Sequence, residues 1–185
     1  MRKSQQLQFE IFKSINTIGK GFGGAGLKGN PKEKRPFSSK HLIHVILKSS
    51  KAKGANSFLA PRNAKRVHQA VRSMGRKTGV EIRDYVNVGN HLHLLIKSHH
   101  RLCVTRFLRA IAGLIPRLVL GCEKGRPLGE AFWDGRPYSK ILAGGLRPLK
   151  VIKSYFAKNR RQGFWSPDKK ASWPMHGFSQ RVPDG

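Results

Sequence analysis

Hydrophobic and polar positions alternate along several short segments of the chain, as they do in half-buried strands. Residues 41–47 are apolar and rich in β-branched side chains, which predicts a strand. Two further strands are predicted over residues 80–87 and 91–97, with a tight turn at residues 89–90 between them. A short fourth strand is expected over residues 139–142. The chain therefore carries the strands of one small sheet.

Three other segments place apolar side chains at helical spacing. Residues 62–78 predict the first helix, and Pro61 suits its first turn. Residues 102–120 predict a second helix, which Pro116 should kink or split. Residues 146–161 predict a final helix. The order strand, helix, strand, strand, helix, strand favours an α+β domain with an antiparallel sheet and helices on one face, followed by the last helix.

The two ends of the chain lie outside this pattern. Residues 1–36 are predicted to form a basic flexible arm, because residues 19–26 are too rich in glycine for a stable element. The ordered domain is expected over residues 37–165. Residues 166–185 lack clear periodicity and are interpreted as a C-terminal tail.

The composition fits one modest domain and indicates the chemistry of its partner. Its 185 residues are 38% hydrophobic, which is enough for one core. Lys and Arg number 37 against 9 Asp and Glu, giving a formal net charge of +28. This excess favours nucleic acid, because the release of counterions drives cationic proteins onto polyanions. Binding to a membrane surface is the competing interpretation. It would need one dominant basic amphipathic helix, whereas the charge is spread over the whole chain.

Neither a membrane nor a secreted location is indicated. No apolar run approaches the length of a membrane span, and no apolar secretory core follows the basic N-terminus. Cys103 and Cys122 are far apart and have no partner cysteines at metal-binding spacing. A reducing cytoplasm is therefore the expected compartment.

The third predicted strand carries the most informative pattern. Side chains alternate between the two faces of a strand, so Leu92, Leu94 and Ile96 point toward a helix-covered core. His91 and His93 then point together to the other face, where two imidazoles can reach one metal ion. Such an open site suits a catalytic divalent ion better than a structural zinc, which needs four protein ligands. Two exposed histidines on a polar sheet face are the alternative interpretation.

The last predicted helix carries a candidate nucleophile. Tyr155 and Asn159 lie four residues apart and therefore share a face. Neighbouring cations lower the pKa of a phenol and attract phosphate, whereas Asn159 offers a carbonyl oxygen as a hard metal ligand. A half-buried core tyrosine on an amphipathic helix is the alternative. The basic residues beside the tyrosine, which are candidates for DNA binding, are Lys150, Lys153, Lys158, Arg160 and Arg161.

Three further side chains are weaker candidates. His41 and His44 stand at odd separation in the first predicted strand and should face opposite sides. One of them could lie near the metal, but a polar strand face is the favoured interpretation. Tyr138 is a second candidate nucleophile, although it follows a proline and lacks an amide four residues on. It is expected to pack, or to stack on a base.

Together these residues resemble the insertion-sequence-200-like transposases, and especially their REP-associated tyrosine transposase branch. Residues 91–93 are similar to the family's histidine–hydrophobic–histidine (HUH) motif. Tyr155 with Asn159 resembles the family's Tyr-x-x-x-Gln/Asn helix, with asparagine where many members carry glutamine. Residues 37–45 and 132–138 resemble its opening strand and its aromatic connection.

The resemblance implies a ferredoxin-like (RRM-like) sheet with the histidines on its open face and a C-terminal helix that bears the tyrosine. His91, His93 and Asn159 would bind Mg²⁺ or Mn²⁺, and Tyr155 would attack a phosphate of single-stranded DNA. The products would be a 5′-phosphotyrosine and a free 3′-hydroxyl, which a second strand end could rejoin without ATP. The implied partner is single-stranded or hairpin DNA, bound by a nucleoid-associated bacterial protein. It would be a monomer, or a homodimer that exchanges the tyrosine helix.

Two other functions remain open on the same fold. A non-catalytic nucleic-acid-binding module would use the sheet face and the basic arm, as RNA-binding sheets do. That function predicts aromatic side chains on the central strands, where this sequence has histidines, so the enzyme is favoured. A domesticated transposase would keep the site but cut dispersed hairpin repeats for its host.

Overall fold

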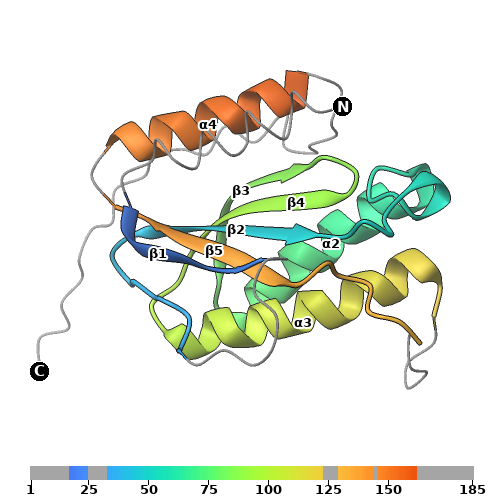
Figure 1. Ribbon diagram of the computed structural model, residues 1–185, viewed down its shortest axis with the longest axis horizontal. Coiled ribbons are helices and arrows are strands. Elements are labelled where there is room, and N and C mark those ends of the chain that lie inside the picture. The colour runs from blue at the N-terminus through green and yellow to red at the C-terminus, as the bar shows by residue number, and fades with distance from the viewer. Residues whose placement is uncertain (1–16, 25–32, 123–128, 144–145, 162–185) are drawn as a thin grey trace, which may run out of the picture.

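A five-stranded antiparallel sheet forms the centre of the protein, with the strand order β1-β5-β2-β4-β3. The computed structural model describes residues 17–24, 33–122, 129–143 and 146–161, which are the coloured parts of Figure 1. The strands are β1 (Thr17–Gly24), β2 (Leu42–Lys48), β3 (Glu81–Asn87), β4 (His91–Lys97) and β5 (Arg136–Leu142).

Helices cover both faces of this sheet. Two helices, α2 and α3, pack together on one face, and α4 crosses the opposite face (Figure 1). This arrangement confirms the predicted α+β, ferredoxin-like fold with a separate C-terminal helix. No helix in the described ranges is long and apolar enough to cross a membrane. The helices are α2 (Pro61–Thr78), α3 (Arg101–Leu120) and α4 (Leu146–Arg161), with a short 3-10 helix η1 (Gly54–Asn56).

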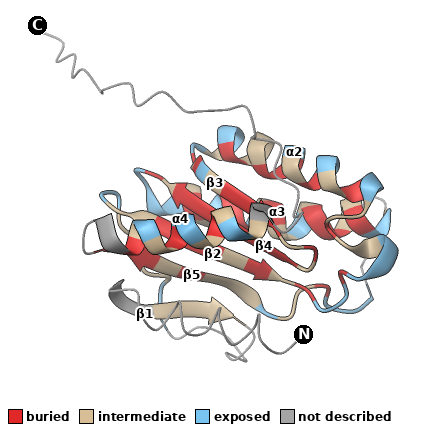
Figure 2. Cartoon of the chain, turned by 90° about the horizontal axis from the view of Figure 1, so that it is seen from above, coloured by how far each residue is buried: buried red, intermediate tan, exposed pale blue. Residues whose placement is uncertain are grey.

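Strand β4 separates two clusters of buried side chains. Leu92, Leu94 and Ile96 face α2 and α3 and belong to the larger cluster. Leu95 points the other way and packs with Phe156 of α4 in a smaller cluster. The predicted core face of this strand is therefore confirmed. Figure 2 shows buried residues on the central strands, whereas residues 21–24 of β1, at the sheet edge, are only partly buried.

Pro116 does not split the second helix, because α3 runs without interruption from Arg101 to Leu120. A proline removes the N–H that would bond the carbonyl four residues earlier, here that of Ala112. The Trp133 indole N–H donates to this carbonyl oxygen instead, over 2.8 Å. A tertiary hydrogen bond thus satisfies the acceptor that the proline leaves open.

The glycine-rich segment also differs from its prediction. Residues 17–24 form β1, which pairs with β5 along the sheet edge, although residues 19–26 were expected to form no stable element. Gly21 lies under the Tyr138 ring, and a Cβ atom there would overlap the phenol. Glycine is needed at this point because of that close approach. Residues 1–16 and 25–32 of the predicted arm lie outside the described residues, as does the predicted tail.

The predicted fourth strand is longer than its apolar pattern indicated. β5 begins at Arg136 and not at residue 139. It pairs with β2 on one side and with β1 on the other, so backbone hydrogen bonds on both edges extend it. A strand that pairs with a neighbouring strand on each side does not need apolar side chains at its start, because the backbone hydrogen bonds to both neighbours stabilise it. This extension places Arg136 and Tyr138 within the sheet.

Candidate functional site

The two histidines of β4 lie side by side on the sheet face that α4 covers. His93 is fully buried and His91 is 9% exposed. Their rings are nearly parallel, with an interplanar angle of 16° and centroids 6.0 Å apart. The alternation of side chains along the strand thus brings them together as predicted. The alternative of two exposed histidines on a polar face does not fit this burial.

His91 presents one ring nitrogen for a ligand. Its Nδ1 lies 2.6 Å from Oδ1 of Asn90, an arrangement that suits a proton on Nδ1 and a lone pair on Nε2. Burial, and then the positive charge of Lys48, lower the pKa of His91 to about 4, while Asp134 raises it. The ring is therefore neutral at pH 7, which is the form that binds metal ions.

His93 lies between two polar neighbours. Its Nδ1 is 3.4 Å from Nε2 of His44, and its Nε2 is 3.3 Å from the hydroxyl oxygen of Tyr155. Burial, followed by the charges of His44 and His91, holds the pKa of His93 well below its usual value. A neutral ring with its proton on Nδ1 can donate to His44 and leave Nε2 as an acceptor. The nitrogen that faces Tyr155 is thus the one able to accept a proton or to bind a cation.

His44 is not on a polar strand face, and that interpretation is corrected. The residue is 1% exposed, because α4 covers this face of β2. Its ring stacks on His93 with centroids 5.6 Å apart and meets the Phe156 ring edge-on. Burial, and then the charge of Lys140, lower its pKa to about 3. Alternation along the strand already placed the His44 side chain on the face opposite to Ile43. Only the pairing of β2 with β4 shows that this is the face that carries His93.

His41 does not contribute to this site. It precedes β2, and its Nδ1 lies 2.9 Å from the Ser38 hydroxyl. The sequence placed both histidines of this segment on one strand, whereas only His44 lies within it.

Tyr155 reaches the site from the middle of α4. Its ring is half-buried and meets the His93 ring edge-on, with centroids 5.1 Å apart. The neighbouring residues Ile152 and Phe156 are fully buried in the smaller cluster and fix the helix on the sheet. Tyr155 is therefore a half-buried residue of an amphipathic helix, which was the alternative interpretation of the sequence. Its hydroxyl nevertheless faces His93, one of the two histidines of the histidine–hydrophobic–histidine segment.

Asn159 is placed one turn beyond Tyr155 on the same helix. Its Nδ2 donates to the backbone oxygen of Tyr155 over 2.8 Å, which leaves the amide oxygen available as an acceptor or ligand. Among the contacts of the described residues, none joins Asn159 to either histidine of β4. Its role as a metal ligand stays a prediction.

The predicted basic residues lie on α4, the helix that bears Tyr155. Lys150, Lys153 and Lys158 are exposed, so they can meet a phosphate backbone without losing a protein partner in the core. Arg160 and Arg161 lie in the last turn of the helix, and their side chains are outside the described residues. Their predicted contact with DNA likewise stays a prediction.

Tyr138 lies on the same sheet face but in a different environment. It pairs with Ile46 of β2, which in turn pairs with His93, so one strand separates it from the histidines. Its ring packs over Gly21 and Gly24 of β1. Burial raises the pKa of the Tyr138 phenol, which disfavours the phenolate. The expectation that Tyr138 packs is met.

The donor set fits a divalent cation with open coordination positions. The described residues contain no cluster of three His, Cys, Asp or Glu side chains that could hold a metal. The two neutral imidazoles of His91 and His93 lie together, and the amide oxygen of Asn159 stays a predicted third ligand, so water or a substrate oxygen would supply the other ligands. Asn90 also gives His91 the second hydrogen bond that usually orients a metal-binding histidine.

This chain is similar to one protein family and to a solved structure. A family model described as transposase, IS200-like, matches residues 38–159, which include both histidines of β4 and the tyrosine. One solved structure that matches comes from Deinococcus radiodurans R1 and is provisionally described as a transposase. It is 17% identical to this chain, with a TM-score of 0.42, and the match covers 70% of this chain and 98% of that one. No curated protein matches this chain.

Proposed function

Because the chain belongs to the IS200-like transposase family, we propose that it cleaves and rejoins single-stranded DNA with Tyr155 as the nucleophile and Mg²⁺ or Mn²⁺ as the cofactor. The observation that carries this proposal is the 3.3 Å distance between the Tyr155 hydroxyl and Nε2 of His93. It joins the candidate nucleophile to the candidate metal site. The net charge of +28 supports DNA as the partner.

The proposed reaction is a transfer of one phosphodiester bond. The Tyr155 oxygen attacks the scissile phosphorus, an O–P bond forms to the tyrosine, and the bond from phosphorus to the 3′-oxygen breaks. The tyrosine loses its proton and the departing 3′-oxygen gains one, so the products are a 5′-phosphotyrosine and a 3′-hydroxyl. A second 3′-hydroxyl attacks the phosphotyrosine in the reverse step. The phosphodiester energy is retained, and no nucleotide cofactor is consumed.

The residues of the site have different proposed roles. His91 and His93, with the amide oxygen of Asn159, would hold the cation, which supplies Lewis-acid polarisation of the phosphate. The contact between the Tyr155 hydroxyl and Nε2 of His93 places the hydroxyl beside the nitrogen that would bind the cation, and His44 orients His93 through its other ring nitrogen, Nδ1. The buried contacts of α4 fix the tyrosine, so little freedom has to be lost before attack.

The geometry supports attack within a single chain. In one chain, α4 folds back across the sheet that carries His93, and the tyrosine hydroxyl already faces the histidine (Figure 1). No exchange of the helix between subunits is needed to assemble the site. We therefore propose that the monomer is the active unit. A homodimer in which the two subunits exchange their tyrosine helices would contradict this proposal.

A covalent-adduct assay tests the nucleophile. The protein is incubated with single-stranded hairpin DNA and Mn²⁺, and a denaturing gel reports DNA that stays attached to protein. Tyr155→Phe should abolish the adduct and leave DNA affinity nearly unchanged, because it removes only the hydroxyl. The matched control, Tyr138→Phe, should keep the adduct. An adduct that survives Tyr155→Phe but is lost in Tyr138→Phe would show that the assignment is wrong.

The same assay tests the cofactor. Chelation with EDTA should stop adduct formation while DNA binding continues, and added Mn²⁺ should restore the adduct. Adduct formation that continues in EDTA would contradict the histidine metal site. DNA binding without any adduct under all metal conditions would favour a non-catalytic binding module.

A further inference from the structure

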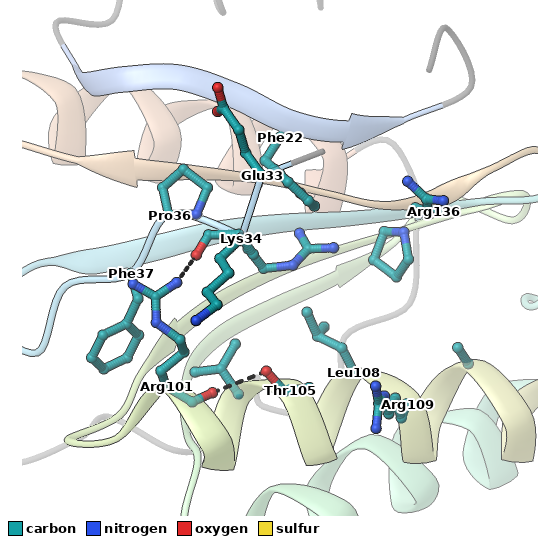
Figure 3. A pocket seen from close by; sticks show the side chains of 14 residues that line it. Phe22, Glu33, Lys34, Pro36, Phe37, Arg101, Thr105, Leu108, Arg109 and Arg136 are labelled. Carbon is teal, nitrogen blue, oxygen red and sulfur yellow. Dashed lines mark hydrogen bonds between the residues drawn. The ribbon is translucent and has the colours of Figure 1, made fainter. Parts of the chain in front are cut away.

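Cationic side chains lie at two different places relative to the sheet. One is a cavity of about 650 Å³ between β1, residues 33–37 and α3, with Arg109 and Arg136 among its lining residues (Figure 3). It lies on the sheet face that α3 covers, so the sheet separates it from Tyr155. The other place is the end of β2, where Lys48 lies on the face that carries the histidines. This second place adjoins the proposed reaction.

Lys48 is the cross-strand partner of His91. The register pairs the last residue of β2 with the first residue of β4, and paired residues of antiparallel strands point to the same face. After burial, the positive charge of Lys48 is the next cause that lowers the pKa of His91. The Lys48 ammonium therefore lies within electrostatic reach of the histidine pair.

Lys48 also marks the end of the histidine pair that a DNA strand can reach. Exposure increases from His93, which is fully buried, through His91, at 9%, to the Lys48 side chain, at 40%. The Tyr155 hydroxyl, in contrast, faces His93, the buried member of the pair. A phosphate bound at the histidine pair would therefore have the nucleophile near one end and the Lys48 ammonium near the other.

Asp134 holds the lysine at this position. One of its carboxylate oxygens lies 3.9 Å from the Lys48 ammonium nitrogen. The other accepts the Ser50 backbone N–H over 2.6 Å, and the Asp134 N–H donates to the Lys48 carbonyl oxygen over 3.0 Å. The carboxylate is thus fixed on the segment that follows the strand. An ammonium carries three N–H donors, so this ion pair leaves others for a substrate oxygen.

We propose that Lys48 is a catalytic residue whose ammonium donates a hydrogen bond to the departing 3′-oxygen, and that Asp134 positions it. The inference rests on the proposed function and assigns the stabilisation of the leaving group to a residue. When the tyrosine oxygen bonds to phosphorus, the electron pair of the breaking bond passes to the 3′-oxygen. The ammonium stabilises this developing negative charge. The tyrosine proton passes to water and the 3′-oxygen takes a proton from water, so Lys48 keeps its own.

Lys51 provides a matched control. Its side chain is 42% exposed, against 40% for Lys48, and it also forms an ion pair, with Glu130 over 2.6 Å. It lies three residues beyond the end of β2, outside the pairing with β4. Lys48→Met and Lys51→Met remove the same charge and keep an unbranched side chain. A general loss of attraction to DNA should therefore affect both variants alike.

The rate of adduct formation is measured on saturating single-stranded hairpin DNA, with either oxygen or sulphur at the 3′ position of the cleaved bond. On the oxygen substrate, Lys48→Met should react roughly 100-fold more slowly than Lys51→Met, which should match the parent protein. On the sulphur substrate, the two variants should react at nearly equal rates. A departing thiolate is a much weaker base than an alkoxide and needs little stabilisation.

Equal rates of the two variants on the oxygen substrate would overturn the inference. A defect of Lys48→Met that persists in full on the sulphur substrate would also overturn it, because that result describes a contact away from the leaving group. Mn²⁺ affinity is a second measurement that does not need catalysis. Removal of a cation beside His91 should leave this affinity unchanged or raise it, and a loss would show that Lys48 supports the metal site instead.

Asp134→Asn tests the positioning role. It should slow the reaction of the oxygen substrate less than Lys48→Met does, and it should cause no further loss in the Lys48→Met protein, because Asp134 acts through the lysine. Losses that multiply in the double variant would contradict this role. The sulphur substrate should again restore the rate of Asp134→Asn.

The adduct assay separates this inference from the proposed function. An adduct in the parent protein, together with equal rates of the two lysine variants, contradicts the role of Lys48 alone. Absence of an adduct in the parent protein on every hairpin DNA would contradict the proposed function, and the role of Lys48 would fall with it.

Discussion

The hydroxyl oxygen of Tyr155 lies 3.3 Å from Nε2 of His93, although 62 positions separate the two residues in the chain. Buried contacts of Ile152 and Phe156 on α4 hold this relationship in place. Because of this contact, one chain can supply both the tyrosine and the histidines. His44, which lies beside His93, is then expected to position it.

A mixing experiment tests whether both groups act from one chain. His93→Ala and Tyr155→Phe proteins should each form no adduct, and their mixture should form none either, because neither chain holds a complete site. The measurement is the denaturing gel, with the mixture of wild type and Tyr155→Phe as the positive control. Recovery of adduct in the mixture of the two variants would show that the tyrosine helix is exchanged between subunits.

His44 is expected to act as a positioning residue for His93. His44→Asn removes the ring that lies 3.4 Å from Nδ1 of His93, so His93 should bind metal less firmly. We expect Mn²⁺ affinity to fall about 10-fold, the lower end of the effect of removing such partners. Titration with Mn²⁺, followed by electron paramagnetic resonance, measures the change. His41→Asn is the control, and equal affinities in the two variants would contradict the role.

The buried histidines should make the metal-free fold sensitive to acid. The pKa of His44 is about 3 in the folded protein and about 6.5 when unfolded. Its contribution is therefore complete above pH 6.5 and is lost as the pH falls, because only the unfolded chain takes up the proton. The loss is about 2 kcal/mol between pH 7 and pH 5 for this residue. Urea unfolding in EDTA at both pH values measures it, and His44→Asn should show a smaller loss than the parent protein.

Trp133 and Pro116 should be coupled in stability. Trp133→Phe leaves the Ala112 carbonyl without its indole donor, and this should lower the free energy of unfolding by about 1–3 kcal/mol. In the Pro116→Ala background, the alanine N–H can donate to the same carbonyl, so the cost of Trp133→Phe should be smaller. A double-mutant cycle by urea denaturation gives the coupling. Strictly additive effects would show that the hydrogen bond does not support the helix.

Periodicity along each element predicted much of the fold and part of the site. Alternation along β4 placed His91 and His93 opposite Leu92 and Leu94, and helical spacing placed Tyr155 beside Asn159. These relationships lie within one element, where fixed backbone geometry sets the direction of each side chain. The sequence could therefore define two halves of a site, one on a strand and one on a helix.

Tertiary structure decided how separate elements meet. It placed α4 over the histidines, set β2 beside β4 so that His44 stacks on His93, and let Trp133 replace the hydrogen bond that Pro116 removes. It also added the glycine-rich β1 to the sheet edge, where β1 pairs with β5. Local periodicity says which way a side chain points but not which neighbour it meets, because that depends on packing between segments far apart in the chain.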